Sequence, residues 1–196
     1  VKPEIVLSCI DKEIDGFNTL TINDIMKISK ENKKDCDKNN YEHYIKEQDI
    51  FYIIFTSGST GKPKGVSITY ANLNHFLDWY TAYYDGKGPQ VFLGHPPFSF
   101  DLSVMSLWPA LYMHIPLIQI DKEHIQDFKV LFKTLEESKA TVWISTPSFA
   151  EMCLADPSFN EDLLPELEQF VFCGEKLFSS TVEKLMERFP KAEVVN

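Results

Sequence analysis

The stretch FYIIFTSGSTGKPKG, residues 51–65, constrains the fold more than any other part of the sequence. Its first five residues are apolar or aromatic, which is typical of a strand buried on both faces. The next ten contain three glycines, four hydroxyl side chains and two lysines. Glycines let the backbone turn its N–H groups toward an anion, hydroxyls add hydrogen-bond donors, and lysines add positive charge. The stretch therefore predicts a strand that leads into a polyphosphate-binding loop, with ATP as a candidate ligand.

This loop differs from two common nucleotide-binding patterns. In the pattern G-x-x-x-x-G-K-[ST] a Ser or Thr follows the lysine, whereas Pro63 follows Lys62 in this chain. The spacing also does not fit G-x-G-x-x-G. For a loop of this composition, an alternative without function is a flexible Ser/Gly hairpin that links two strands.

Short apolar runs alternate with stretches of helical period along the rest of the chain. This alternation predicts an α/β fold with a mostly parallel sheet joined by crossover helices. Residues 115–118, like 51–55, form a nearly continuous apolar run and should be buried on both faces. We expect strands at 5–9, 50–56, 65–69, 91–94, 115–120, 141–145, 170–173 and 193–195, and helices at 70–84, 101–113, 126–139, 147–154 and 180–189.

Local residues predict how several helices begin. Thr69 should cap the first helix, Ser179 or Ser180 should cap the last, and Pro147 suits a first helical turn. Pro109 conflicts with a continuous helix, because an internal proline kinks or ends one. Residues 29–48 are rich in Lys, Asn, Asp and Glu, which predicts a solvated loop.

Composition excludes several classes of protein. The formal net charge of -10 argues against nucleic acid as a partner, because such binding depends on neutralising phosphates. No apolar run approaches the roughly 20 residues of a transmembrane segment. The histidines lack metal-ligand spacing, so no metal site is predicted. The four cysteines lack a C-x-x-C spacing, and reduced thiols in a cytoplasmic protein fit best; they are Cys9, Cys36, Cys153 and Cys173.

Two further stretches place polar groups directly after predicted strands. PFSFDLS, residues 97–103, contains Asp101, which could pair with a desolvated ammonium group or cap its helix, and the residues alone favour neither. FVFCGE, residues 170–175, ends a strand in a glycine turn. Ligands of open α/β sheets collect at such carboxyl ends of strands.

Residues 56–65 resemble the phosphate-loop signature of adenylate-forming enzymes, which include amino-acid adenylation domains, acyl-CoA synthetases and luciferases. The resemblance implies that the loop contacts the β and γ phosphates of ATP, with Mg²⁺ screening the charge. By position, the implied ATP-binding residues are Thr56, Ser57, Gly58, Ser59, Thr60 and Lys64.

Residues 97–103 resemble the F-D-x-S element of amino-acid adenylation domains, in which the aspartate pairs with the substrate's α-ammonium group. Asp101 occupies that position. FCGE (172–175), WISTPSF (143–149) and ERFPKA (187–192) resemble D-alanine:carrier protein ligases more closely than peptide-synthetase domains. In that family the cysteine of FCGE lines the pocket beside the small side chain, which makes Cys173 a substrate-binding candidate. Its alternative is a buried core thiol.

The resemblance implies a two-step reaction. D-alanine would react with ATP to give D-alanyl-AMP and would then pass to the phosphopantetheine thiol of a carrier protein, for teichoic acid D-alanylation. The implied catalytic lysine and ribose-binding aspartate lie outside the chain, so residues 1–196 are expected to be part of the N-terminal domain, without the C-terminal domain and inactive alone. An adenylation domain for another amino acid and a non-catalytic nucleotide-binding module are the alternatives.

Overall fold

The computed structural model describes residues 6–8, 15–16, 19–21, 23–24, 27, 45–56 and 63–196. These residues belong to two units, 1–44 and 45–196. In the first unit β1 (Val6–Ser8) pairs in parallel with β2 (Thr19–Thr21), a strand that the sequence did not predict. Of the loop predicted at 29–48, residues 45–48 are described, and they are exposed and contain no helix or strand. The remainder of that prediction lies outside the described residues.

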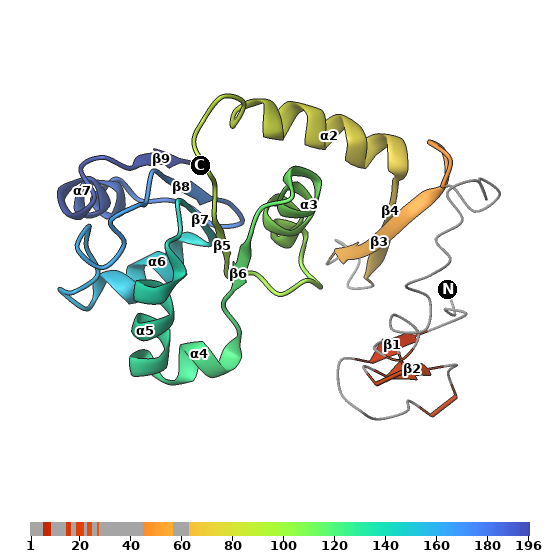
Figure 1. The fold of residues 1–196 in the computed structure, drawn as a ribbon, viewed down its shortest axis with the longest axis horizontal. Coiled ribbons are helices and arrows are strands. Elements are labelled where there is room, and N and C mark those ends of the chain that lie inside the picture. The colour runs from red at the N-terminus through yellow and green to blue at the C-terminus, as the bar shows by residue number, and fades with distance from the viewer. Residues whose placement is uncertain are drawn as a thin grey trace. The chain divides into compact units, whose positions relative to one another are not determined.

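The second unit is built around a five-stranded parallel sheet in the order β6-β5-β7-β8-β9 (Figure 1). Every neighbouring pair in this sheet is parallel, which confirms the predicted α/β fold. The strands are β5 (Phe92–Gly94), β6 (Leu117–Gln119), β7 (Val142–Ser145), β8 (Gln169–Phe172) and β9 (Glu193–Val195).

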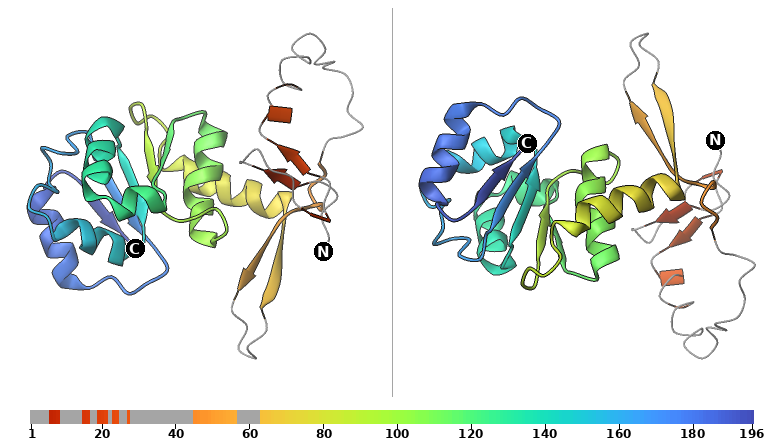
Figure 2. Two further views of the ribbon diagram at one scale, coloured as in Figure 1. Left: turned by 90° about the horizontal axis from the view of Figure 1, so that it is seen from below. Right: turned by 90° about the horizontal axis from the view of Figure 1, so that it is seen from above.

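Helices cover both faces of this sheet and make a three-layer structure (Figure 2). Residues of α2 and α3 pack on one face, and residues of α5, α6 and α7 pack on the other. The helical segments are α2 (Tyr70–Ala82), the 3₁₀ turn η3 (Asp101–Ser103), α3 (Val104–Met113), α4 (Lys122–Gln126), α5 (Phe128–Ser138), α6 (Pro147–Leu154) and α7 (Ser179–Arg188).

The central strands have no exposed face. All residues of β5, β7 and β8 are buried, because side chains that alternate along a strand meet a helix layer on either side. Trp143 of β7 is fully buried on the α5–α6–α7 face. Its ring centroid lies 5.2 Å from that of Phe159 and 5.4 Å from that of Phe149.

Two predictions about burial are wrong. Among the described strands, β3 (Ile50–Thr56) pairs with β4 (Lys64–Thr69) alone, in an antiparallel hairpin. Most of β3 is therefore half-buried, and Phe55 is 67% exposed. β6 is only half-buried as well, because it is an edge strand of the five-stranded sheet.

The helix ends agree with the sequence in part. Thr69 caps α2 through a reciprocal pair of hydrogen bonds with Asn72, and Pro147 is the first residue of α6, both as predicted. The predicted cap at Ser179 or Ser180 is wrong, because α7 already begins at Ser179 and Phe178 precedes it without a side-chain cap. α3 also does not end at Pro109 but continues to Met113. Burial of Pro109 and the next residue against the sheet offsets the hydrogen bond that proline cannot donate.

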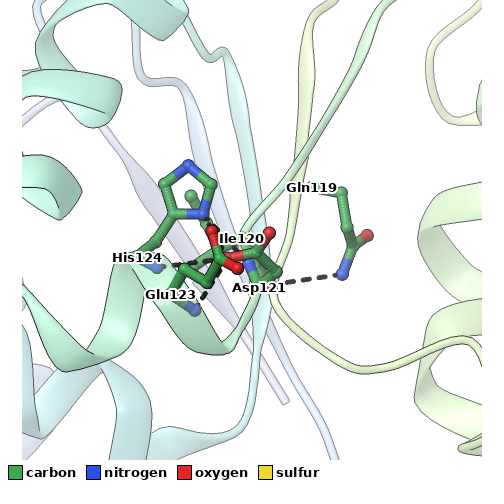
Figure 3. Close-up of polar contacts among 5 residues, drawn as sticks. All are labelled: Gln119, Ile120, Asp121, Glu123 and His124. Carbon is green, nitrogen blue, oxygen red and sulfur yellow. Dashed lines mark hydrogen bonds and ion pairs between the residues drawn. The ribbon is translucent and has the colours of Figure 1, made fainter. Parts of the chain in front are cut away.

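The sequence did not predict the short helix α4. This helix begins at a single aspartate side chain, that of Asp121. Asp121 Oδ1 accepts hydrogen bonds from the backbone N–H groups of Glu123, at 2.9 Å, and His124, at 3.1 Å (Figure 3). The His124 imidazole folds back to within 2.6 Å of the same oxygen. Asp127 caps α5 in the same way, by accepting hydrogen bonds from the backbone N–H groups of Lys129 and Val130. The helix predicted at 126–139 is therefore preceded by a separate short helix, α4.

None of the helices in the described part of the chain has the length and apolar character of a membrane span.

Replacing Trp143 by alanine should lower the free energy of unfolding by about 3–5 kcal/mol, because it removes the largest fully buried side chain and leaves a cavity. Urea denaturation followed by circular dichroism measures this loss. Trp79→Ala is the matched control, since Trp79 is 69% exposed and should cost about 1 kcal/mol or less. Equal losses for the two variants would contradict the packing described above.

Candidate functional site

The candidate site lies where the three central strands end. His95, Thr146 and Cys173 directly follow β5, β7 and β8, and parallel strands bring their carboxyl ends to one edge of the sheet. A cavity of about 390 Å³ lies elsewhere, against the hairpin, whereas one of about 570 Å³ lies at this edge. The residues that line the larger cavity are His95, Pro96, Pro97, Phe100, Asp101, Leu102, Thr146, Ser148, Gly174 and Glu175.

Asp101 lines this cavity with a carboxylate that no described residue pairs with an opposite charge. It is exposed, and its Oδ1 accepts one hydrogen bond, from the backbone N–H of Leu102 at 2.9 Å. The cap position of η3 belongs to Phe100, so the alternative that Asp101 serves as the helix cap is not supported. A carboxylate with a free oxygen in a cavity can accept a hydrogen bond from an ammonium group.

Asp101 also lies close enough to the hairpin to affect Tyr52. Burial raises the pKa of the Tyr52 hydroxyl, and the negative charge of Asp101 raises this pKa further. The hairpin itself rests on α3 through aromatic contacts, with the Phe51 and Trp108 ring centroids 5.0 Å apart. The strand β3, which leads to residues 57–62, therefore packs against α3.

Glu175 is a second carboxylate in the cavity lining, and the sequence did not single it out. Its Oε2 accepts a hydrogen bond from the backbone N–H of Ser148, at 3.1 Å, in the first turn of α6. Negative charge is favourable at a helix N-terminus. The lining contains no Lys or Arg among the described residues, so the two carboxylates make the cavity suited to a cation.

Cys173 follows β8 directly and is exposed. The alternative that it is a buried core thiol is therefore wrong. Its neighbour Gly174, at φ +88°, turns the chain toward the cavity, and Gly174 rather than Cys173 is among the lining residues. The buried thiol is Cys153, which is fully covered and whose pKa burial raises to about 12. Cys9 and Cys36 lie outside the described residues.

His95 lines the same cavity as the two carboxylates. Its ring lies flat on the ring of Phe149, with centroids 3.9 Å apart and planes 9° apart. Its backbone N–H donates to the carbonyl oxygen of Ile144, at 3.1 Å. Burial lowers the pKa of the imidazole, and the charge of Glu175 opposes this. No sequence motif identified His95 as a site residue. Its place in the cavity lining and its stacking on Phe149 make it a candidate.

The predicted phosphate loop is described only at its base. Thr56 and Lys64 face each other across the hairpin as a register pair, and both are exposed. Ser57, Gly58, Ser59 and Thr60 lie outside the described residues. A hairpin at this position is compatible with both a phosphate loop and a simple linker. Among the described residues, no group of three or more His, Cys, Asp or Glu side chains is arranged to hold a metal ion.

The two described thiols should differ sharply in reactivity. At pH 8 iodoacetamide should modify Cys173, whereas Cys153 should react roughly a hundredfold or more slowly, because it is buried and holds its proton up to a pKa of about 12. Peptide mapping by mass spectrometry separates the two sites. Full unfolding in urea should make both react. Rapid labelling of Cys153 in the native protein would show that its environment is not the one described.

Comparison with known proteins gives consistent matches. The family model described as "AMP-binding enzyme" matches residues 7–196. The D-alanine--D-alanyl carrier protein ligase of Bacillus licheniformis is 54% identical over 153 residues, which cover 78% of this chain and 30% of the relative. The ligase of the same name from Bacillus cereus is 48% identical over 186 residues, covering 91% of this chain and 37% of the relative. The chain thus spans about a third of the length of these relatives.

Solved structures share the fold. The complex of VinN with L-aspartate superposes with a TM-score of 0.77 at 20% identity, over 98% of this chain and 49% of that chain. The Vibrio cholerae adenylation domain AlmE, in complex with glycyl-adenosine-5'-phosphate, gives a TM-score of 0.69 at 24% identity, over 91% of this chain and 31% of that chain. The family match spans nearly the whole sequence. The parallel sheet, with a cavity at the ends of its strands, agrees with this match. The chain therefore belongs to the AMP-binding enzyme family.

Proposed function

We propose that the protein containing this chain is an ATP-dependent ligase that activates D-alanine as D-alanyl-AMP and transfers it to the phosphopantetheine thiol of a carrier protein. Relatives about half identical to this chain bear the name D-alanine--D-alanyl carrier protein ligase. The chain, residues 1–196, would be part of the N-terminal domain, and the catalytic lysine would come from a C-terminal domain outside it. On this proposal the protein acts in the cytoplasm, in the D-alanylation of teichoic acid for the cell wall.

The observation that carries the proposal is the Asp101 carboxylate in the cavity at the strand ends. Asp101 has no ion-pair partner among the described residues, and Glu175 is engaged with the N-terminus of α6. An amino acid brings an ammonium group that a fatty acid lacks. A fatty acid has no positively charged group that could pair with this carboxylate, whereas the ammonium group of an amino acid can pair with it and donate hydrogen bonds to it.

Within this chain, the residues bind and orient rather than transfer protons. Asp101 would hold the ammonium group and so turn the substrate carboxylate away from the acidic part of the cavity. Thr56, Ser57, Gly58, Ser59, Thr60 and Lys64 would hold the ATP phosphates. Bound ATP supplies the α-phosphorus that the carboxylate attacks, with release of pyrophosphate. Mg²⁺ would screen the charge of these phosphates.

The discriminating experiment is ATP-pyrophosphate exchange by the complete gene product that contains this chain. The panel comprises D-alanine, L-alanine, glycine, larger amino acids and a fatty acid. Exchange dominated by D-alanine supports the proposal. Exchange with another amino acid would favour a peptide-synthetase adenylation domain, and no exchange with any substrate would favour a non-catalytic nucleotide-binding module.

Asp101→Asn should reduce amino-acid-dependent exchange by about two to three orders of magnitude, because the bound substrate would enclose its ion pair with Asp101, and losing one partner of an enclosed pair costs about 3–5 kcal/mol. Steady-state exchange kinetics measure the loss, and the fold should remain intact by circular dichroism. Asp85→Asn serves as the matched control, since Asp85 is exposed and lies outside the cavity lining. Near-normal exchange by Asp101→Asn would refute the ammonium role.

Cys173→Ala should lower the preference for D-alanine over L-alanine by about tenfold, the scale on which one small side chain discriminates by shape. The ratio of kcat/KM for the two enantiomers is the measurement. Cys153→Ala is the matched cysteine control: it removes a core thiol, so it should lower stability and leave the enantiomer ratio unchanged. An unchanged ratio in Cys173→Ala would remove Cys173 from the substrate site.

A further inference from the structure

We propose that His95 is a specificity-determining residue of this site, which accepts a hydrogen bond from the ammonium group of the amino-acid substrate through a neutral imidazole nitrogen. This inference rests on the proposed function only in that the substrate is an amino acid. It does not depend on which amino acid is activated, because every amino acid presents the same ammonium group.

The first support is the unsatisfied nitrogen of His95. Nδ1 is shielded from solvent and has no hydrogen-bond partner among the described residues, although the residue lines the cavity. A buried polar atom without a partner is unfavourable, so native proteins nearly always supply one. A ligand that fills the cavity and displaces the groups covering Nδ1 can be that partner.

The second support is that the ring is held in place. The backbone N–H of His95 extends the pairing of β5 with β7, by its bond to Ile144, and so fixes the start of the side chain. The imidazole then stacks on Phe149, which itself stacks on Trp143 with ring centroids 5.4 Å apart. A ring fixed by the core can define one ligand position, which a mobile side chain cannot do.

The third support is the charge of the cavity, which decides whether the His95 imidazole donates a hydrogen bond to the ligand or accepts one from it. The titratable groups in the lining with His95 are Asp101, from the turn after β5, and Glu175, from the turn after β8; the first turn of α6 contributes none. A carboxylate ligand at His95 would meet two like charges. An ammonium group would be attracted by both, and a neutral imidazole offers it one acceptor nitrogen.

This role requires an uncharged ring. Burial among apolar rings favours the neutral form and lowers the pKa of His95, although Glu175 opposes the shift. Protonation would remove the acceptor and place a positive charge beside the ammonium group. Amino-acid affinity should therefore be constant above the ordinary histidine range, near pH 6.5, and should fall as the pH drops below it.

The test uses the complete gene product and three variants. His95→Phe keeps a flat ring on Phe149 and removes both nitrogens. His95→Asn keeps a polar atom near the position of Nδ1. His75→Phe is the matched control, because His75 is exposed on α2. ATP-pyrophosphate exchange from pH 5.5 to 8.5 gives KM separately for D-alanine and for ATP, and propionate, which lacks an ammonium group, is measured as a competitor.

At pH 8, His95→Phe should raise the KM for the amino acid about tenfold, as expected for one lost hydrogen bond to a charged group, with the KM for ATP and the Ki for propionate within about twofold of wild type. It should also lose the rise of KM at low pH that wild type shows. His95→Asn should recover part of the affinity. An unchanged amino-acid KM in His95→Phe would overturn the inference.

Two other outcomes would also overturn it. If all ligands weaken together in His95→Phe and the thermal unfolding midpoint falls, His95 acts through packing on Phe149. If the wild-type protein shows no exchange with any amino acid, the proposed function fails and this inference fails with it. If wild type activates an amino acid other than D-alanine, a raised KM for that amino acid in His95→Phe supports the inference and an unchanged KM overturns it.

Discussion

The structure depends on the burial of three parallel strands, β5, β7 and β8, on both faces. Their residues have no exposed face, so helices must cover the sheet on either side. Because the strands are parallel, their carboxyl ends must also meet at one edge, where no helix layer continues the core. The same constraint that builds the core therefore brings His95, Thr146 and Cys173 to one place and leaves a cavity there.

A close approach at Gly94 connects this sheet to Asp101. A Cβ atom at Gly94 would lie 2.9 Å from the Ser106 hydroxyl and 3.1 Å from Gln119 Oε1, so only glycine lets α3 pack this near to β5. The position of α3 in turn fixes η3, from which Asp101 enters the cavity. The position of the Asp101 carboxylate thus depends on the close packing of α3 on β5.

The sequence predicts what is local and misses what depends on neighbours in space. Thr69 and Pro147 were recognisable as helix starts because their effect acts within one turn. The burial of 51–55 was mispredicted because the same apolar run suits a central strand and a hairpin, and only the partners distinguish them. The motif predicted Asp101 as a candidate, and Asp101 lines the cavity. Glu175 and His95 line it too but were not predicted, because the contacts that place them are with Ser148 and Phe149, which lie on α6.

The arrangement separates the charges of the two proposed ligands. The cavity lining is acidic, whereas the loop 56–65 contains two lysines and no acidic residue. An amino acid carries both an ammonium group and its reactive carboxylate, so the proposed pairing of the ammonium group with Asp101 would direct the carboxylate out of the acidic region. β3 lies beside Asp101 through Tyr52 and ends at Thr56, the first residue of the loop. In the proposed function, this one strand would join the site for the ammonium group to the loop for the phosphates, and the substrate carboxylate would then face the electrophilic α-phosphorus of ATP.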